Sequence, residues 1–316
     1  MSLVKNRHNT RQISVGNIKV GGGAPIAVQS MTNTYTQDID ATVAQIQRLY
    51  DAGCEIVRVA VPDMEAAHAI RKIKNALELK EINIPVIADI HFDYRLALAS
   101  ADAGADGLRI NPGNIGEKWK IKAVADCATA LNIPIRVGVN SGSLEKDIVE
   151  KMGSTAKAMA QSAMRNIEIL EDLGFYDIKI SLKASDVERT VEAYRLISTM
   201  TDVPLHVGVT EAGGLYAGIT KSAIGIGMIL ADGIGDTIRV SLTRDPVEEV
   251  RVGWEILRAL GLRKRGPEII SCPTCGRCRI NLFDIAEKVE NALLKCPLTI
   301  KVAIMGCVDC KGFTCS

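Results

Sequence analysis

Residues 134–140 read Pro134-Ile-Arg-Val-Gly-Val-Asn140, and this stretch decides the fold. Three aliphatic residues share one face of the segment, while Arg136 and Asn140 share the other, because side chains alternate along a strand. Strands of parallel sheets that are covered on both sides are normally apolar throughout. The segment is therefore predicted to be a strand whose polar face has a specific purpose.

Similar segments recur along the chain and alternate with segments of helical periodicity. Strands are expected at 25–31, 55–61, 85–91, 107–111, 134–140, 177–183, 204–210 and 236–243. Helices are expected at 39–52, 65–79, 94–103, 121–131, 156–173, 187–200, 222–231 and 247–260. Eight such units predict an α/β protein with a (β/α)8 barrel of the TIM type. An open doubly wound sheet is the alternative, but no Gly-x-Gly-x-x-Gly follows the first strand.

The composition fits this architecture and excludes several classes of protein. The 316 residues are 47% hydrophobic and 24% charged, which suits one large domain and a small one, expected at 1–263 and 264–316. A net charge of +1 argues against a nucleic-acid partner or a polybasic membrane anchor. The chain has no run of about 18 apolar residues, and its N-terminus is polar. Both features predict a cytoplasmic protein without a membrane span.

One face of each later strand is polar, with the same parity within the strand. These positions should point into the barrel, since the apolar set packs under the helices. Four arginines and two lysines are among them, and burying unpaired charge is costly. Asp89 and Glu211 can compensate part of this charge, and the remainder predicts a phosphate or diphosphate ester at the C-terminal mouth. An internal salt-bridge network is the alternative, and Arg239, Lys179 and a hydrogen-bonded His206 suit such a structural role best.

The cysteines indicate a metal centre. Seven of the nine follow residue 271, which favours metal binding over a disulfide framework. Cys272-x-x-Cys275 and Cys307 supply three thiolates, the ligands that iron–sulfur clusters and zinc share. A four-cysteine zinc site that includes Cys310 is left open by this spacing.

Taken together, the motifs resemble a known family over residues 10 to 307. They are 29–33 (QSMTN), 88–92 (ADIHF), 108–114 (LRINPGN), 136–143 (RVGVNSGS), 209–213 (VTEAG), 271–277 (SCPTCGR) and 305–307 (MGC). The chain resembles the 4-hydroxy-3-methylbut-2-enyl diphosphate synthases, iron–sulfur oxidoreductases of the non-mevalonate isoprenoid pathway.

This resemblance implies a function and a site. The expected reaction opens the ring of 2-C-methyl-D-erythritol 2,4-cyclodiphosphate reductively, with electrons from flavodoxin or ferredoxin, in a homodimer. The small domain is expected to be ferredoxin-like and to carry a [4Fe–4S] cluster on Cys272, Cys275 and Cys307. Glu211 is implied as the proton donor. The implied substrate-binding residues are Arg58, Asp89, His91, Arg109, Asn111, Arg136, Asn140, Lys183 and Ser241.

The end of the chain departs from the family pattern. Thr314 stands where the family has the glutamate that is its fourth cluster ligand, and Cys310 is the nearest substitute. The small domain is therefore expected to be incomplete and metal-poor, with weak turnover. Two other functions are left open. One is a catalytically impaired phosphate-binding barrel with zinc or no metal in its C-terminal module. The other is a hydrolytic or pterin-binding barrel without a redox metal.

Overall fold

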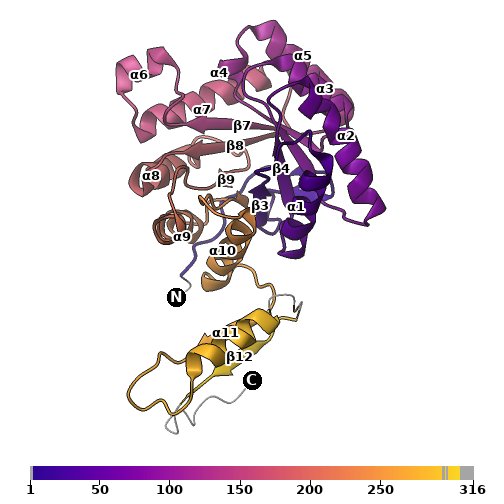
Figure 1. Cartoon of the computed structure of the whole chain (residues 1–316). Coiled ribbons are helices and arrows are strands. Elements are labelled where there is room, and N and C mark those ends of the chain that lie inside the picture. Colours follow the sequence, from indigo (N-terminus) through magenta and orange to yellow (C-terminus); the bar gives the residue numbers. More distant parts are fainter. Residues whose placement is uncertain (1–2, 294–295, 297, 307–316) are drawn as a thin grey trace. The chain divides into compact units, whose positions relative to one another are not determined.

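The computed structural model describes residues 3–293, 296 and 298–306 (Figure 1). The chain forms two compact units, of which the first ends at Leu260 and the second begins at Gly261. In the described part, every helix is too short or too polar to span a lipid bilayer.

The first unit is a ring of eight parallel strands, and it confirms the predicted (β/α)8 barrel. Its strands are β3 (Ala27–Met31), β4 (Ile56–Ala60), β5 (Val86–Asp89), β6 (Gly107–Ile110), β7 (Ile135–Asn140), β8 (Ile178–Lys183), β9 (His206–Val207) and β10 (Thr237–Ile238). They pair in the order β8-β7-β6-β5-β4-β3-β10-β9. A parallel bridge between Ile180 and Leu205 joins β8 to β9 and closes the ring.

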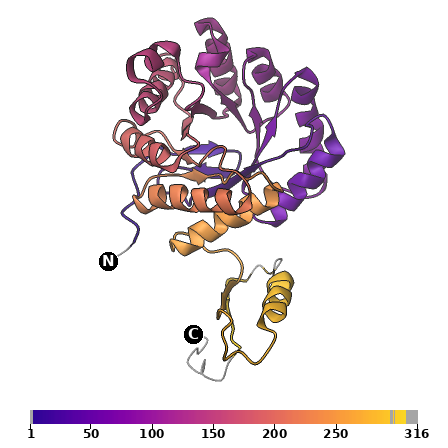
Figure 2. The ribbon, with the colours of Figure 1, turned by 60° about the vertical axis from the view of Figure 1, so that its left-hand side comes forward.

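Helices surround these strands, as Figure 2 shows. They are α1 (Ile39–Asp51), α2 (Met64–Leu79), α3 (Tyr94–Asp102), α4 (Pro112–Ile115), α5 (Lys118–Leu131), α6 (Lys146–Met152), α7 (Ala156–Glu171), α8 (Val187–Ile197), α9 (Leu215–Ala231) and α10 (Pro246–Ala259). Five of them begin after an aspartate whose carboxylate accepts a backbone N–H of the first turn, which stabilises a helix start. These caps hold the mouth loops at defined helix ends.

Several elements differ from the sequence prediction. Strands β9 and β10 are two residues long instead of seven and eight, because the chain leaves the ladder near Gly208 and Arg239 to form the mouth. Helix α9 begins at Leu215 rather than at Ser222. Gly218 is unfavourable in a helix, so the sequence pattern does not indicate a helix at this position. The glycine is nevertheless required, because a Cβ there would lie 2.5 Å from Leu242.

A short N-terminal hairpin underlies the barrel and was not predicted. Strands β1 (Ile13–Val15) and β2 (Ile18–Val20) pair antiparallel. Ile13, Val15 and Val20 form one buried cluster with the inward residues Ala27, Ile56 and Ile87 at the start of β3, β4 and β5. The bottom of the barrel interior is therefore apolar, in contrast to its polar mouth.

The second unit contains one βαβ motif. Strands β11 (Glu268–Ser271) and β12 (Lys301–Ile304) pair in parallel, and α11 (Leu282–Leu293) lies between them in the sequence. Leu282 and Ile304 are its buried aliphatic residues among those described. This core is small, as expected for a unit of about 50 residues that metal or a partner helps to stabilise.

Candidate active site

The sequence-predicted barrel residues gather at the C-terminal ends of the strands, the usual location of active sites in this fold. These residues lie within a strand or in the loop that follows it, and Arg136, the second residue of β7, is the farthest from the C-terminal end of its strand. They are Arg58 (β4), Asp89 and His91 (β5), Arg109 and Asn111 (β6), Arg136 and Asn140 (β7), Lys183 (β8), Glu211 (after β9) and Ser241 (after β10).

Asp89 is the centre of the ion pairs at the mouth. Its carboxylate lies 3.5 Å from Nε of Arg58 and 3.2 Å from Nη1 of Arg109. The ring of His91 lies 3.8 Å from the same carboxylate and 3.3 Å from Nη1 of Arg109. Burial alone would raise the pKa of Asp89, but the surrounding arginines outweigh it and lower the pKa to about 2. Asp89 is therefore ionised and holds two arginines in place.

A second group of cations lies beside this centre on β7 and β8. Arg136 is 3% exposed and donates from Nη1 to the Ser181 hydroxyl at 3.4 Å. Lys183 is 7% exposed, and burial together with Arg136 lowers its pKa well below the ordinary lysine value. Lys179, four residues earlier on the same face of β8, is 1% exposed.

Two glycines make room for these cations. A Cβ on Gly138 would lie 2.6 Å from Nε of Arg109, and a Cβ on Gly208 would lie 2.9 Å from Nζ of Lys183. Contacts that short force a shift, so a larger residue at Gly138 must displace the Arg109 side chain, and one at Gly208 must displace Lys183 and also the Arg239 carbonyl oxygen, which would lie closer still. Glycine in β7 and directly after β9 therefore leaves room where long basic side chains cross the barrel.

Glu249 is a site residue that the sequence argument missed. It lies on α10, is 4% exposed, and accepts hydrogen bonds from Ser30 at 3.0 Å, from the Leu242 N–H at 3.0 Å and from Arg239 at 3.4 Å. The available signal was a glutamate within the apolar face of an amphipathic helix. Arg239 thereby has the structural partner that was expected for it.

Glu211 does not compensate the cations as the sequence suggested. Its side chain is exposed, and within the described residues it makes no ion pair. The backbone of Glu211 adopts φ +52°, a left-handed conformation that is unusual for a residue other than glycine. Such local strain clusters at functional sites, where surrounding structure maintains it.

The charges of the interior do not balance among the described residues. Six cations (Arg58, Arg109, Arg136, Lys179, Lys183 and Arg239) face two carboxylates that contact them, Asp89 and Glu249. Asp236 is also buried, but its carboxylate already accepts from Arg7, Thr10 and the Leu205 N–H. Excess buried positive charge of this kind is stabilised by a bound anion.

Within the described part of the chain, the remaining predicted polar residues take no part in the ion pairs of the mouth. The Asn111 side chain accepts the Gly113 N–H at 3.1 Å and begins α4, so a structural task already occupies its oxygen. His206 is fully buried, and its Nδ1 lies 2.8 Å from the Thr237 hydroxyl, as expected for a core histidine. Asn140 and Ser241 are half-buried at the rim.

The thiol turn follows β11. The Cys272 N–H donates to Ile304 O at 3.1 Å, and the Cys278 N–H donates to Cys275 O at 2.9 Å. Hydrogen bonds from Arg277, the backbone N–H first and then the side chain, lower the pKa of Cys275 and favour the thiolate, the form that ligates metal.

The chain segment before Cys307 lies against this turn. The Arg279 N–H donates to Gly306 O at 3.1 Å. Cys307, Cys310 and Thr314 themselves lie outside the described residues, and no metal-binding group of three side chains occurs within those described. Cys272 and Cys275 are free thiols on a tight turn, and Gly306, the residue before Cys307, is hydrogen-bonded to the same segment. Cysteines are the usual ligands of iron–sulfur clusters, so these residues suit such a cluster.

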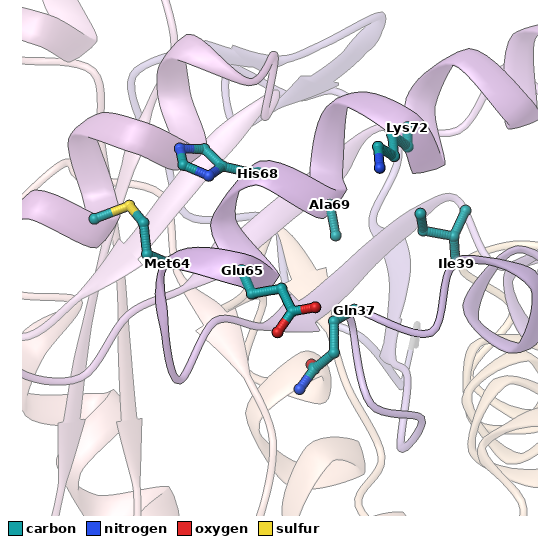
Figure 3. Close-up of a pocket in the computed structure, with 7 residues that line it drawn as sticks. All are labelled: Gln37, Ile39, Met64, Glu65, His68, Ala69 and Lys72. Atoms are coloured by element: carbon teal, nitrogen blue, oxygen red, sulfur yellow. The ribbon is translucent and has the colours of Figure 1, made fainter.

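A separate pocket of 390 Å³ lies on the outer helices, lined by Gln37, Ile39, Met64, Glu65, His68, Ala69 and Lys72 (Figure 3). Most of these residues come from α2, with Ile39 from α1. None of the predicted site residues lines it, so it does not belong to the cation-lined mouth.

The fold and the mouth together define a (β/α)8 barrel with a cation-lined mouth, and the same chain carries a small unit with a thiol turn. The chain belongs to the GcpE family: residues 10–254 match the GcpE TIM-barrel domain, and residues 268–310 match the GcpE protein C-terminal domain.

Relatives of known name cover most of the chain. It is 59% identical over 300 residues to "4-hydroxy-3-methylbut-2-en-1-yl diphosphate synthase (flavodoxin)" from Geobacter sulfurreducens, covering 95% of this chain and 84% of the relative. The protein of the same name from Clostridium perfringens is 56% identical over 304 residues, covering 96% and 86%.

Solved structures support the fold alone. A dihydropteroate synthase from Xanthomonas albilineans aligns with a TM-score of 0.54 and 15% identity over 78% of this chain and 98% of that one. A type I 3-dehydroquinate dehydratase from Clostridium difficile aligns with a TM-score of 0.53 and 13% identity over 78% and 98%. At this identity, the pterin-binding alternative gains no functional support from the shared barrel.

Proposed function

We propose that this chain catalyses the reductive ring opening of 2-C-methyl-D-erythritol 2,4-cyclodiphosphate to 4-hydroxy-3-methylbut-2-enyl diphosphate. The observation that carries the proposal is the excess of buried cations at the mouth, which fits a substrate with two phosphates. The names of relatives more than 50% identical over nearly the whole chain specify which diphosphate chemistry to test.

The diphosphate is held by Arg58, Arg109, Arg136 and Lys183. Planar guanidinium groups bind phosphate oxygens in pairs, and Lys183 adds a point charge. Asp89 fixes Arg58 and Arg109 before the substrate arrives, so less side-chain entropy is lost on binding. Asn111, Asn140, Ser241 and His91 complete the polar lining of the site.

Glu211 is the proton donor in this proposal. Its exposed carboxyl follows β9 at the mouth, where a proton can be exchanged with solvent and delivered to the reacting carbon. The strained backbone at this position supports a functional assignment, because a glycine or asparagine would hold the same turn more easily.

A [4Fe–4S] cluster held by Cys272, Cys275 and Cys307 is the proposed cofactor. When bound, it would relay the two electrons of the reduction one at a time from an external donor and would offer a Lewis-acidic iron to the oxygen that leaves. Flavodoxin is the proposed electron donor, as the names of the relatives indicate, and ferredoxin is the alternative. The cysteines of the second unit would hold the cluster, while the barrel residues bind and protonate the organic substrate.

A homodimer would place the thiol unit of a second copy over the mouth. Three aromatic residues on that side are unusually exposed: Tyr35 at 82% and Phe92 at 72% in loops, and Tyr216 at 86% in the first turn of α9. Exposed aromatic side chains favour contact with a partner protein. Mixing an Arg136→Ala copy with a Cys272→Ser copy tests this arrangement: recovered turnover supports a shared site, and none refutes it.

The binding assignment is tested by calorimetry with the cyclic diphosphate. Arg136→Ala should weaken binding by roughly 1.5–3 kcal/mol, because one charge-assisted contact is lost. Arg165→Ala is the matched control, since Arg165 pairs with Asp147 on the outer surface. Equal affinity in the wild type and Arg136→Ala contradicts the assignment. A colourless, zinc-containing protein after anaerobic purification would instead favour the zinc-bound phosphate-binding barrel.

A further inference from the structure

Among the inward-facing residues of the barrel, several buried polar atoms have no hydrogen-bond partner in the described part of the chain. They are Nζ of Lys179, Nε2 of His206, Nε of Arg136 and both amide atoms of Gln29. All four residues occupy inward positions and are at most 3% exposed. Buried polar groups are nearly always hydrogen-bonded, so the unpartnered atoms mark this part of the interior as one that can accept further hydrogen-bonding groups.

Lys179 is surrounded mainly by other cations. It pairs in register with Arg136 of β7, and Lys183 lies four residues further along its own strand. Arg58 of β4 also acts on it, and it acts in turn on His206 of β9. The carboxylate that favours its charged form, Asp236, is already engaged by Arg7 at 2.8 Å.

The excess positive charge can be relieved by only some of these groups. Arginine does not release its proton in proteins, so relief falls on the lysines and the histidine. Lys179 is the deepest of the lysines and has no hydrogen-bond acceptor among the described residues. Burial, and then Arg136, lower the pKa of Lys179 to about 7. When the mouth contains no anion, Lys179 is therefore largely neutral above neutral pH.

We propose that Lys179 couples anion binding to proton uptake: an anion bound at Arg109, Arg136 and Lys183 draws one proton from solvent onto Nζ of Lys179. The proton adds to the nitrogen lone pair, and no other bond is made or broken. This inference rests on the proposed function only for the identity of the anion. It makes Lys179 a positioning residue, which strengthens the field beneath the phosphates without touching them.

The direction of the pH dependence follows. The pKa of Lys179 is about 7 in the free protein and rises when an anion lies above it. Below pH 7 the lysine is already charged, and binding needs no proton. Above pH 7 binding must bring one, so affinity falls as pH rises, by at most about tenfold per pH unit.

Calorimetry in two buffers of different ionisation enthalpy counts the protons taken up. The probes are the cyclic diphosphate and sulfate, neither of which titrates between pH 6 and 8. A group with a pKa near 7 takes up about 0.9 proton at pH 8 and about 0.1 at pH 6 when it becomes fully charged. Lys179→Met should lower the uptake at pH 8 by the proton that Lys179 carries, as should Lys179→Arg, whose charge is permanent; uptake that remains in both variants belongs to Lys183, whose pKa is also lowered by burial. His206→Gln is the matched control and should retain the full uptake.

Each outcome decides the question. Uptake at pH 8 that is undiminished in Lys179→Met assigns the proton to another group and overturns the proposal. Should the variants fail to fold, the wild type still decides, because equal proton counts at pH 6 and pH 8 overturn it. If sulfate binds with uptake while the cyclic diphosphate does not bind, the proposed function fails and this inference stands. If neither probe binds, both are wrong.

Discussion

Replacing Asp89 with asparagine keeps the shape of the side chain but removes the negative charge that Arg58 and Arg109 share. The magnitude follows from the pKa of the carboxyl group, which falls from an ordinary 3.8 to about 2 in the folded protein. At about 1.4 kcal/mol per pKa unit, the ionised carboxylate contributes roughly 2–3 kcal/mol to the free energy of unfolding at pH 7. Asp89→Asn should lose this amount.

The pH dependence distinguishes a charge effect from a packing effect. Because the folded-state pKa is lowered, the stabilisation is complete above pH 4 and is lost as pH falls towards 2. At pH 3 the difference in the free energy of unfolding between the wild type and Asp89→Asn should shrink to about half of its value at pH 7. A loss of packing would be the same at both values.

Urea unfolding followed by tryptophan fluorescence is the appropriate assay. Both tryptophans, Trp119 and Trp254, belong to the barrel, so the signal reports this unit alone. Phosphate and sulfate are omitted from the buffer, since an anion among the arginines would replace the missing charge. Asp126→Asn, which breaks an exposed pair with Lys122, is the control and should cost less than about 0.5 kcal/mol. The reasoning is refuted if Asp89→Asn is equally destabilised at pH 3 and pH 7, or not at all.

Three further predictions concern the same sites. Gly138→Ala should weaken binding of the cyclic diphosphate at least tenfold in calorimetry, because its Cβ displaces Arg109; unchanged affinity would show that the guanidinium has room to move. Glu211→Gln should bind the ligand normally but turn over about 10²-fold more slowly or worse, whereas lost affinity with normal turnover would assign Glu211 to binding. Cys272→Ser should lose the absorption of the iron–sulfur centre after anaerobic reconstitution, while Cys127→Ser, on the outer helix α5, should keep it; equal iron content in the two would exclude Cys272 as a ligand.

Much of the barrel could be predicted from the sequence, because alternation and periodicity are local signals. The inward parity of Arg58, Arg109, Arg136 and Lys183 follows from the two-residue repeat of a strand. Their meeting at one mouth follows from the closed parallel topology. The expected excess of positive charge was read from the same pattern.

Other features depend on contacts between segments distant in the sequence. The three-residue strands β1 and β2 are too short for a periodic signal, and only their packing under β3, β4 and β5 stabilises them. Glu249 reaches the cations from a helix, which strand parity cannot reveal. The role first assigned to Glu211 as a compensating charge failed because a position after a strand does not determine the direction of a side chain.

The hairpin of β1 and β2 restricts how substrate and product reach and leave the barrel interior. Ile13, Val15 and Val20 close the bottom of the barrel interior with apolar side chains. Substrate and product therefore enter and leave through the mouth alone. Water displaced by an arriving substrate must leave through the mouth as well. Product and substrate therefore compete for the same opening. A domain that covers the mouth during reduction has to move away once in every catalytic cycle.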